Sequence, residues 1–267
     1  MMASDKDPII EVDDLVVKYG DRTVLNGVSF TVRRGEVFVI LGGSGSGKTT
    51  LIRNLVGLMR PASGCIRVKG EDFTAMTDDD RIQQRKKIGM CFQGSALFNS
   101  MTVGENVALP LTEHTSLEPS TIDIMTKIKL ELVGLAGFED YMPSELSGGM
   151  KKRAGIARAM AMDPEIIFYD EPSAGLDPIV AAGIDALIRK LQSTYDLTSV
   201  VVTHEMESVK LIADTVCVLQ QGRVVGLGSL EEVRRLTHPY IQQFFERRPD
   251  AEGSGETDYA RYLTGLD

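Results

Sequence analysis

Residues 37–58 read VFVIL-GGSGSGKTT-LIRNLVGL, which is an apolar run, a glycine-rich loop and then a helical pattern. A strand, a glycine loop and a helix form the context in which G-x-x-x-x-G-K-[ST] binds phosphate, because glycines let successive backbone N–H groups converge on the phosphate oxygens. The helix start adds the positive end of its dipole. A flexible Gly/Ser linker is the alternative, and the flanking strand and helix disfavour it. We therefore predict a nucleoside triphosphate site formed by Gly42, Gly43, Ser44, Gly45, Ser46, Gly47, Lys48, Thr49 and Thr50.

Two side chains of this loop have the chemistry that a nucleotide needs. The Lys48 ammonium is expected to reach the β- and γ-phosphates, and the Thr49 hydroxyl is expected to ligate Mg²⁺.

The composition limits the class of protein. With 43% hydrophobic and 25% charged residues among 267, the chain is of ordinary globular composition. A net charge of -9 disfavours nucleic acid as a partner. The three cysteines lie far apart without a Cys-x-x-Cys pair, which argues against a disulfide framework or zinc site. No apolar run approaches the ~20 residues that span a bilayer, and no signal-like start is present. We expect a cytosolic protein, or one held at a membrane by another subunit.

The pattern of elements predicts an α/β fold. Ile9–Tyr19 and Val24–Val32 alternate like a pair of strands before the glycine loop. From about 94 to 161 the pattern becomes nearly all helical, with a capping box at Thr102 and Glu105 and a similar pair at Ser120 and Asp123. Alternation of strands and helices then resumes, and ends in a hairpin-like pair over 215–227.

A second site signal is the acidic pair at the end of the apolar run Ile166–Tyr169. Asp170 is placed to hold Mg²⁺, and Glu171 would lie beside the γ-phosphate, where a carboxylate can orient or deprotonate water. Alone, such a pair is more often a solvated strand end. The upstream phosphate loop and the turn that follows at Pro172 and Gly175 favour the functional interpretation.

A third signal is Leu146-Ser147-Gly148-Gly149-Met150, which opens another helical pattern. Free N–H groups at a helix start can bind an anion, although Ser-Gly-Gly can also be merely a flexible N-cap. Gln93, the segment Ser173–Asp177 and His204 each follow a predicted strand. A lone histidine is usually structural, but His204 follows the strand after the acidic pair and can meet a γ-phosphate.

With these motifs present in order over about Ile9–Gln243, the chain resembles the nucleotide-binding subunit of an ATP-binding cassette (ABC) transporter. The resemblance implies that Tyr19 stacks on the adenine of ATP, and that Gln93 senses Mg²⁺ and a membrane partner. It also implies a catalytic base at Glu171, catalytic roles for Lys48, Gln93 and His204 as the switch histidine, and Mg²⁺ ligation by Thr49, Gln93 and Asp170. The remaining family positions are the signature residues Ser147, Gly148, Gly149 and Met150, which act in trans, and the D-loop residue Asp177.

One departure is informative, because the family signature usually ends in Gln and this chain has Met150. With residues 93–98 and the Lys151-Lys152-Arg153 run, it is similar to the ATPases of Mla/Mce-type lipid transport systems. That similarity implies phospholipid as the cargo. The alternatives are a transporter ATPase for an amino acid or a metal, and a soluble ABC ATPase that acts on DNA or ribosomes.

The resemblance also implies the architecture and the partners. We expect a P-loop NTPase (RecA-like) core with an N-terminal antiparallel β addition and a helical insertion over about 94–161. This domain covers 9–243, followed by a linker and extension over 244–267. One phosphate loop and one signature per chain imply a head-to-tail homodimer. Further expected partners are an integral membrane permease, small accessory proteins and lipid-binding substrate proteins, with the subunit peripheral at the cytoplasmic face of the inner membrane.

Two docking surfaces are predicted. The aromatic stretch Tyr259–Leu263 beyond a polar linker is expected to dock on a neighbouring subunit, with a frayed terminus as the alternative. A groove beside Gln93 is expected to accept a short permease helix. Its predicted apolar lining, in the segment Gly94–Val103, is Ala96, Leu97, Phe98, Met101 and Val103.

Overall fold

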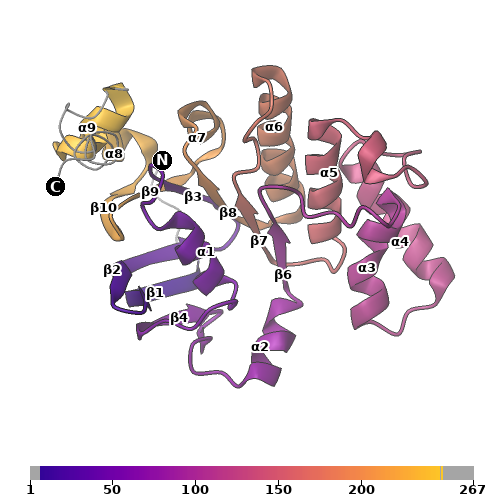
Figure 1. Cartoon of the computed structure of the whole chain (residues 1–267), viewed down its shortest axis with the longest axis horizontal. Coiled ribbons are helices and arrows are strands. Elements are labelled where there is room, and N and C mark those ends of the chain that lie inside the picture. The colour runs from indigo at the N-terminus through magenta and orange to yellow at the C-terminus, as the bar shows by residue number, and fades with distance from the viewer. Residues whose placement is uncertain (1–6, 247, 249–267) are drawn as a thin grey trace, which may run out of the picture.

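β3 (Val37–Leu41) lies inside a six-stranded sheet in the computed structural model, which describes residues 7–246 and 248. The strand order is β10 (Arg223–Gly228), β9 (Thr215–Gln220), β3, β8 (Thr198–Thr203), β7 (Ile166–Asp170) and β6 (Ile88–Cys91). All neighbours from β9 to β6 pair in parallel, and β10 is antiparallel to β9 (Figure 1). The central strands are apolar throughout because both faces of a parallel sheet are buried.

The predicted N-terminal β addition is confirmed as a second, antiparallel sheet. Its order is β2 (Arg22–Arg33), β1 (Pro8–Tyr19), β4 (Ser63–Val68) and β5 (Glu71–Asp72). Helix α1 (Lys48–Leu55) lies between the two sheets (Figure 1). The alternation along β3 separates two cores. Phe38 and Ile40 face α1 and the antiparallel sheet, while Val37, Val39 and Leu41 face the helices on the other side.

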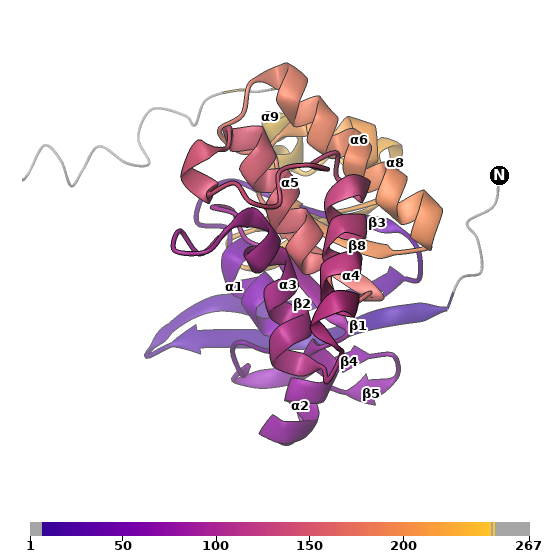
Figure 2. The same ribbon diagram turned by 90° about the vertical axis from the view of Figure 1, so that its right-hand side faces the viewer.

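The predicted helical insertion contains α3 (Val103–His114), α4 (Pro119–Leu132), a short 3-10 turn η1 (Pro143–Glu145) and α5 (Gly148–Ala159). These helices group together in front of the sheets in Figure 2. The capping box of Thr102 and Glu105 is present at the start of α3. The similar box expected at Ser120 and Asp123 is wrong, because the N-cap of α4 is Glu118 and the helix starts at Pro119, whose fixed φ suits a first helical position.

Most of the remaining helices pack on the face of the six-stranded sheet opposite α1, and α2 (Asp78–Arg85) lies beside the edge strand β6. The others are α6 (Pro178–Tyr195), α7 (Met206–Ile212), α8 (Leu230–Arg235) and α9 (Pro239–Glu246). Helix α9 runs across the boundary predicted after residue 243, and its Ile241 is fully buried while Phe244 and Phe245 pack against the core. The predicted docking stretch Tyr259–Leu263 lies outside the described residues. None of the helices within 7–246 has the length and apolarity needed to cross a bilayer.

Candidate nucleotide site

The parallel strands bring the predicted site residues to one edge of the six-stranded sheet. The phosphate loop follows β3, and His204 follows β8. Asp170 ends β7 and Glu171 comes directly after it, while Gln93 follows β6. Because β3, β8, β7 and β6 are successive parallel neighbours, their carboxyl ends meet at this edge. Ligands of open α/β sheets bind at such an edge.

The phosphate loop leaves backbone donors free at the start of α1. The N-cap Gly47 has φ 105° and offers no side-chain cap, so the first N–H groups of the helix have no capping acceptor. At Gly42 a Cβ would approach the carbonyl oxygen of Leu219 to 2.4 Å, so only glycine fits. The Ser46 hydroxyl is buried without a hydrogen-bond partner among the described residues. Uncapped donors and an unpartnered hydroxyl fit a phosphate chain in this loop.

Lys48 is held within the loop. Its ammonium donates to the carbonyl oxygens of Gly42 at 2.7 Å and Gly43 at 3.0 Å. Burial lowers the pKa of Lys48, while the nearby Glu171 and Asp170 carboxylates act against that decrease. A buried cation beside two carboxylates is suited to a polyanionic ligand.

The residues for a magnesium ion fit the chemistry of that ion. Burial raises the pKa of the Asp170 carboxyl, as does the Glu171 charge, while Arg53 and Lys48 lower it. A divalent cation would favour the ionised form of Asp170. The Thr49 side chain is exposed at the start of α1. A magnesium ion at a nucleotide keeps several water and phosphate ligands, so one or two protein oxygens are enough to hold it.

Glu171 has an unusual backbone. Its φ is 49°, in the left-handed region that a residue with a Cβ rarely adopts, and its N–H donates to the Val202 carbonyl at 2.9 Å. The side chain contacts His204, with Oε1 at 2.9 Å from Nδ1. The other oxygen, Oε2, is buried without a partner in the part of the chain that the structure describes. Strained backbone is concentrated at functional sites, and a carboxylate that is oriented through one oxygen and unpartnered at the other can accept a proton from water.

Two residues with no site role predicted from the sequence, Lys152 and Tyr240, also contact this edge. The Lys152 ammonium on α5 donates to the carbonyl oxygens of Gln93 at 2.5 Å and Glu171 at 3.0 Å. The Tyr240 hydroxyl on α9 accepts from the Gly43 N–H at 2.7 Å. Helical spacing from Gly148 could have placed Lys152 on the signature helix. No signal in the sequence relates Tyr240 to the phosphate loop.

The signature loop starts α5 on the far side of β6 and β7 from α1 (Figure 1). The Ser147 hydroxyl caps the helix by accepting from the Met150 N–H at 3.3 Å. A Cβ on Gly149 would approach Val180 Cγ1 to 2.4 Å, and Met150 packs against the core. Gly148 is exposed. Within one chain, the signature glycines therefore lie beside Leu176 and Val180, at the start of α6.

The last two predicted residues are Asp177 and Tyr19. Asp177 caps α6, its Oδ1 accepting from the N–H groups of Ile179 and Val180 at 3.1 Å each. Tyr19 ends β1 with 45% of its surface exposed and its hydroxyl 3.0 Å from Met59 Sδ. Its ring is accessible for stacking.

A groove of about 750 Å³ lies between the α2–β6 region and the helices α3 and α5; we call it the interlobe groove. Ala96 and Phe98 line it, as predicted. Leu97 and Val103 do not, because Leu97 packs against the core and Val103 is fully buried; Met101 is not part of the lining either. The full lining is Ile82, Arg85, Lys86, Ile88, Gly89, Met90, Phe92, Ala96, Phe98, Leu109, Pro110, Glu113, His114, Arg158, Ala159 and Met162.

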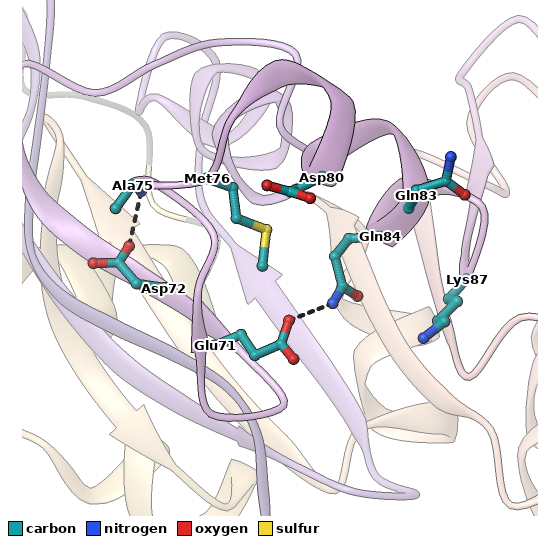
Figure 3. Close-up of a pocket in the computed structure, with 8 residues that line it drawn as sticks. All are labelled: Glu71, Asp72, Ala75, Met76, Asp80, Gln83, Gln84 and Lys87. Carbon is teal, nitrogen blue, oxygen red and sulfur yellow. Dashed lines mark hydrogen bonds between the residues drawn. The ribbon is translucent and has the colours of Figure 1, made fainter.

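A second pocket, of about 590 Å³, lies between β5 and α2 (Figure 3). Glu71, Asp72 and Asp80 line it with a single cation, Lys87, and Glu71 accepts from Gln84 at 2.6 Å. This acidic lining does not suit a nucleotide phosphate.

Comparison with known proteins agrees with this geometry. Residues 25–174 match the profile of the family described as ABC transporter. The chain is 40% identical to "Intermembrane phospholipid transport system ATP-binding protein MlaF" of Haemophilus influenzae, over 91% of this chain and 92% of that protein. It is 39% identical to "Probable ribonucleotide transport ATP-binding protein mkl" of Mycobacterium tuberculosis, over 90% of this chain and 67% of that one. A dimeric post-hydrolysis structure of the ATP-binding cassette MJ0796, bound to ADP and Pi, superposes with TM-score 0.76 at 30% identity, covering 83% of this chain and 98% of that chain.

Proposed function

This chain belongs to the ABC transporter family, and from that premise we propose that it is the ATP-hydrolysing subunit of a complex that moves phospholipid. The ATPase activity follows from the family. The observation that supports a hydrolytic site in this chain most directly is Glu171, whose carboxylate is oriented by His204 on one oxygen and has the other free.

The residues of the sheet edge divide the chemistry of hydrolysis among them. The uncapped N–H groups of α1 bind the phosphate chain, and Lys48 exchanges its contacts with Gly42 and Gly43 for the β- and γ-phosphates. Thr49, Asp170 and Gln93 would hold Mg²⁺, which neutralises charge on the phosphate oxygens. Glu171 accepts a proton from the attacking water through its free oxygen. Tyr19 stacks on the adenine.

A second copy of the chain completes the site. The signature residues Ser147–Met150 start α5, separated from α1 by β6 and β7. In a head-to-tail dimer the signature helix of one copy faces the phosphate loop of the other and adds its own N-terminal donors. The MJ0796 cassette, which is similar over most of this chain, is a dimer bound to ADP and Pi. Asp177 and the exposed Ile179 at the start of α6 belong to this dimer surface.

The interlobe groove would connect the ATPase to the membrane. Exposed Phe92 and Phe98 give it apolar surface, and Arg85, Lys86 and Arg158 outnumber its single carboxylate, Glu113. These features suit a short amphipathic helix that carries acidic side chains, supplied by a permease on the cytoplasmic face of the inner membrane. The chain would thus be peripheral at that face, with accessory and lipid-binding proteins attached through the complex.

The test of this function is purification of the complex from detergent extract. We expect an integral membrane permease to co-purify, phospholipid to be identified by mass spectrometry, and ATPase activity to accompany it. Lys48→Ala should lose nucleotide binding, whereas Glu171→Gln should keep binding and lose turnover. A complex that carries nucleotides instead of phospholipid would favour the cargo named for the mycobacterial relative. An isolated soluble protein without a membrane partner would refute the transport role.

A further inference from the structure

Lys152 lies in the second turn of α5 and reaches the edge where hydrolysis takes place. Its ammonium donates to two carbonyl oxygens, 2.5 Å from that of Gln93 and 3.0 Å from that of Glu171. Those two residues follow or end different strands, β6 and β7. One side chain from the helical insertion therefore joins two segments of the catalytic edge.

These carbonyl groups belong to irregular backbone just beyond the strand ends. Glu171 has a positive φ, and its carbonyl accepts from the Ala174 N–H at 3.3 Å in the turn that follows, so Lys152 adds a second, charged donor to it. Two and three residues after Gln93, Ser95 and Ala96 also have positive φ, at 60° and 48°. Their carbonyl oxygens accept from Arg158 of the same helix, at 2.8 Å each. Basic side chains of α5 thus hold both irregular segments in place.

The charge of Lys152 suits this role. Burial lowers the pKa of Lys152, and the charges of Glu171, Asp170 and Glu205 act against that decrease. An ammonium has three donors, so it can satisfy both carbonyl groups at once, and hydrogen bonds from charged donors are stronger than neutral ones.

We propose that Lys152 is a positioning residue for ATP hydrolysis, which holds the backbone of Glu171 in register with Gln93 and so fixes the carboxylate against the attacking water. This inference rests on the proposed function. Lys152 acts through Glu171 and does not touch the reacting atoms. Misplacement of a catalytic group by ~1 Å can lower a rate on the order of 10²-fold. Loss of the Lys152 hydrogen bonds should therefore lower kcat and leave nucleotide affinity unchanged.

The test compares Lys152→Met, which keeps the length of the side chain without any donor, with Lys152→Arg, which restores charged donors. Lys127→Met is the matched control, because Lys127 is an exposed residue of α4 that pairs with Asp123 of the same helix. The measurements are kcat and KM for MgATP on the purified transport complex, the Kd of a non-hydrolysable ATP analogue, and the Tm of each variant.

We expect Lys152→Met to lower kcat by about 10- to 100-fold while the analogue Kd stays within about threefold of wild type. Lys152→Arg should recover most of the rate, and Lys127→Met should match wild type. If Lys152→Met is not stable enough to assay, Lys152→Gln, which keeps two neutral donors, replaces it.

Three results would overturn the inference. A Lys152→Met variant with kcat within about twofold of wild type means that no positioning occurs. A lowered Tm with unchanged kcat assigns Lys152 to stability alone, and a weakened Kd with unchanged kcat assigns it to binding. A wild-type complex without ATPase activity would instead refute the proposed function, and this inference with it.

Discussion

Asp185 on α6 is a buried acid next to the catalytic edge, with 2% of its surface exposed and Oδ1 unpartnered among the described residues. Its neighbours Ser173, Ser208 and Glu205 form a polar cluster that joins the D-loop to the segment after His204. Burial raises the pKa of the Asp185 carboxyl, as does the Glu205 charge, and the Ser208 hydroxyl lowers it. Burial of the Asp185 carboxyl beside the site therefore lowers the free energy of unfolding.

We therefore predict that Asp185→Asn increases the stability of the fold in a pH-dependent way. Because the folded-state pKa lies above the unfolded value, ionisation of Asp185 at neutral pH disfavours the folded wild type. The neutral amide avoids that penalty, so the variant should be more stable at pH 7, on the order of 1 kcal/mol or about 2–4 °C in Tm. The advantage should shrink as the pH falls through the raised pKa toward the unfolded value. Urea unfolding at pH 7 and under acid conditions measures it, and a variant less stable than wild type at pH 7 would contradict the assignment.

At the scale of elements, the segment between β6 and α3 presents some side chains to the interlobe groove and others to the core. Phe98 is 52% exposed, and its backbone is fixed by Asn106, which accepts from its N–H at 2.7 Å and donates to its carbonyl at 3.0 Å. Its neighbour Leu97 packs inward. The element therefore holds one apolar ring over the groove on a rigid backbone.

This difference predicts the outcome of charge substitution. Phe98→Glu should abolish assembly with the permease, because it places a carboxylate where an amphipathic helix with acidic side chains would dock. The Tm and the nucleotide binding of the isolated subunit should stay unchanged. Leu97→Glu should instead destabilise the fold by several kcal/mol, since it buries a charge against the core. Leu211→Glu on α7, exposed and outside the groove, is the control. Co-purification from detergent extract is the measurement, and an assembled Phe98→Glu complex would place the docking surface elsewhere.

At the scale of the whole molecule, each of the two hydrophobic cores holds a different part of the proposed site. The core between the sheets holds α1 and the phosphate loop, and the core between the six-stranded sheet and the helices holds α5. In the proposed dimer, one copy presents its phosphate loop and the other its signature helix, so a complete site needs two molecules. ATP bound between the copies would contribute contacts to both, and its hydrolysis would remove those contacts.

The dimer should therefore depend on ATP and accumulate when turnover is blocked. Glu171→Gln is expected to lower hydrolysis by ~10²–10⁴-fold and to elute as a dimer with ATP and Mg²⁺, but as a monomer with ADP. Lys48→Ala should remain monomeric under both conditions. Size-exclusion chromatography with light scattering distinguishes the states. A Glu171→Gln protein that hydrolyses ATP at half the wild-type rate would remove Glu171 from the role of general base.

The sequence alone determined what depends on local pattern and period. The strand–loop–helix of residues 37–58, the acidic pair after β7 and the capping box of Thr102 involve neighbours a few residues apart, so their geometry follows from local conformation. The same local reasoning misplaced the start of α4. It predicted Ser120 as the N-cap, whereas Pro119, with its fixed φ, is the first helical residue and Ser120 lies inside the helix.

Only the tertiary structure decided which distant groups meet. Lys152 contacts Glu171 and Gln93 across 19 and 59 residues of sequence, and Tyr240 contacts Gly43 across 197. Whether Leu97 or Phe98 faces the groove depends equally on how α3 and α5 pack against β6. Such contacts depend on strand order and helix packing, which no period within a single segment encodes.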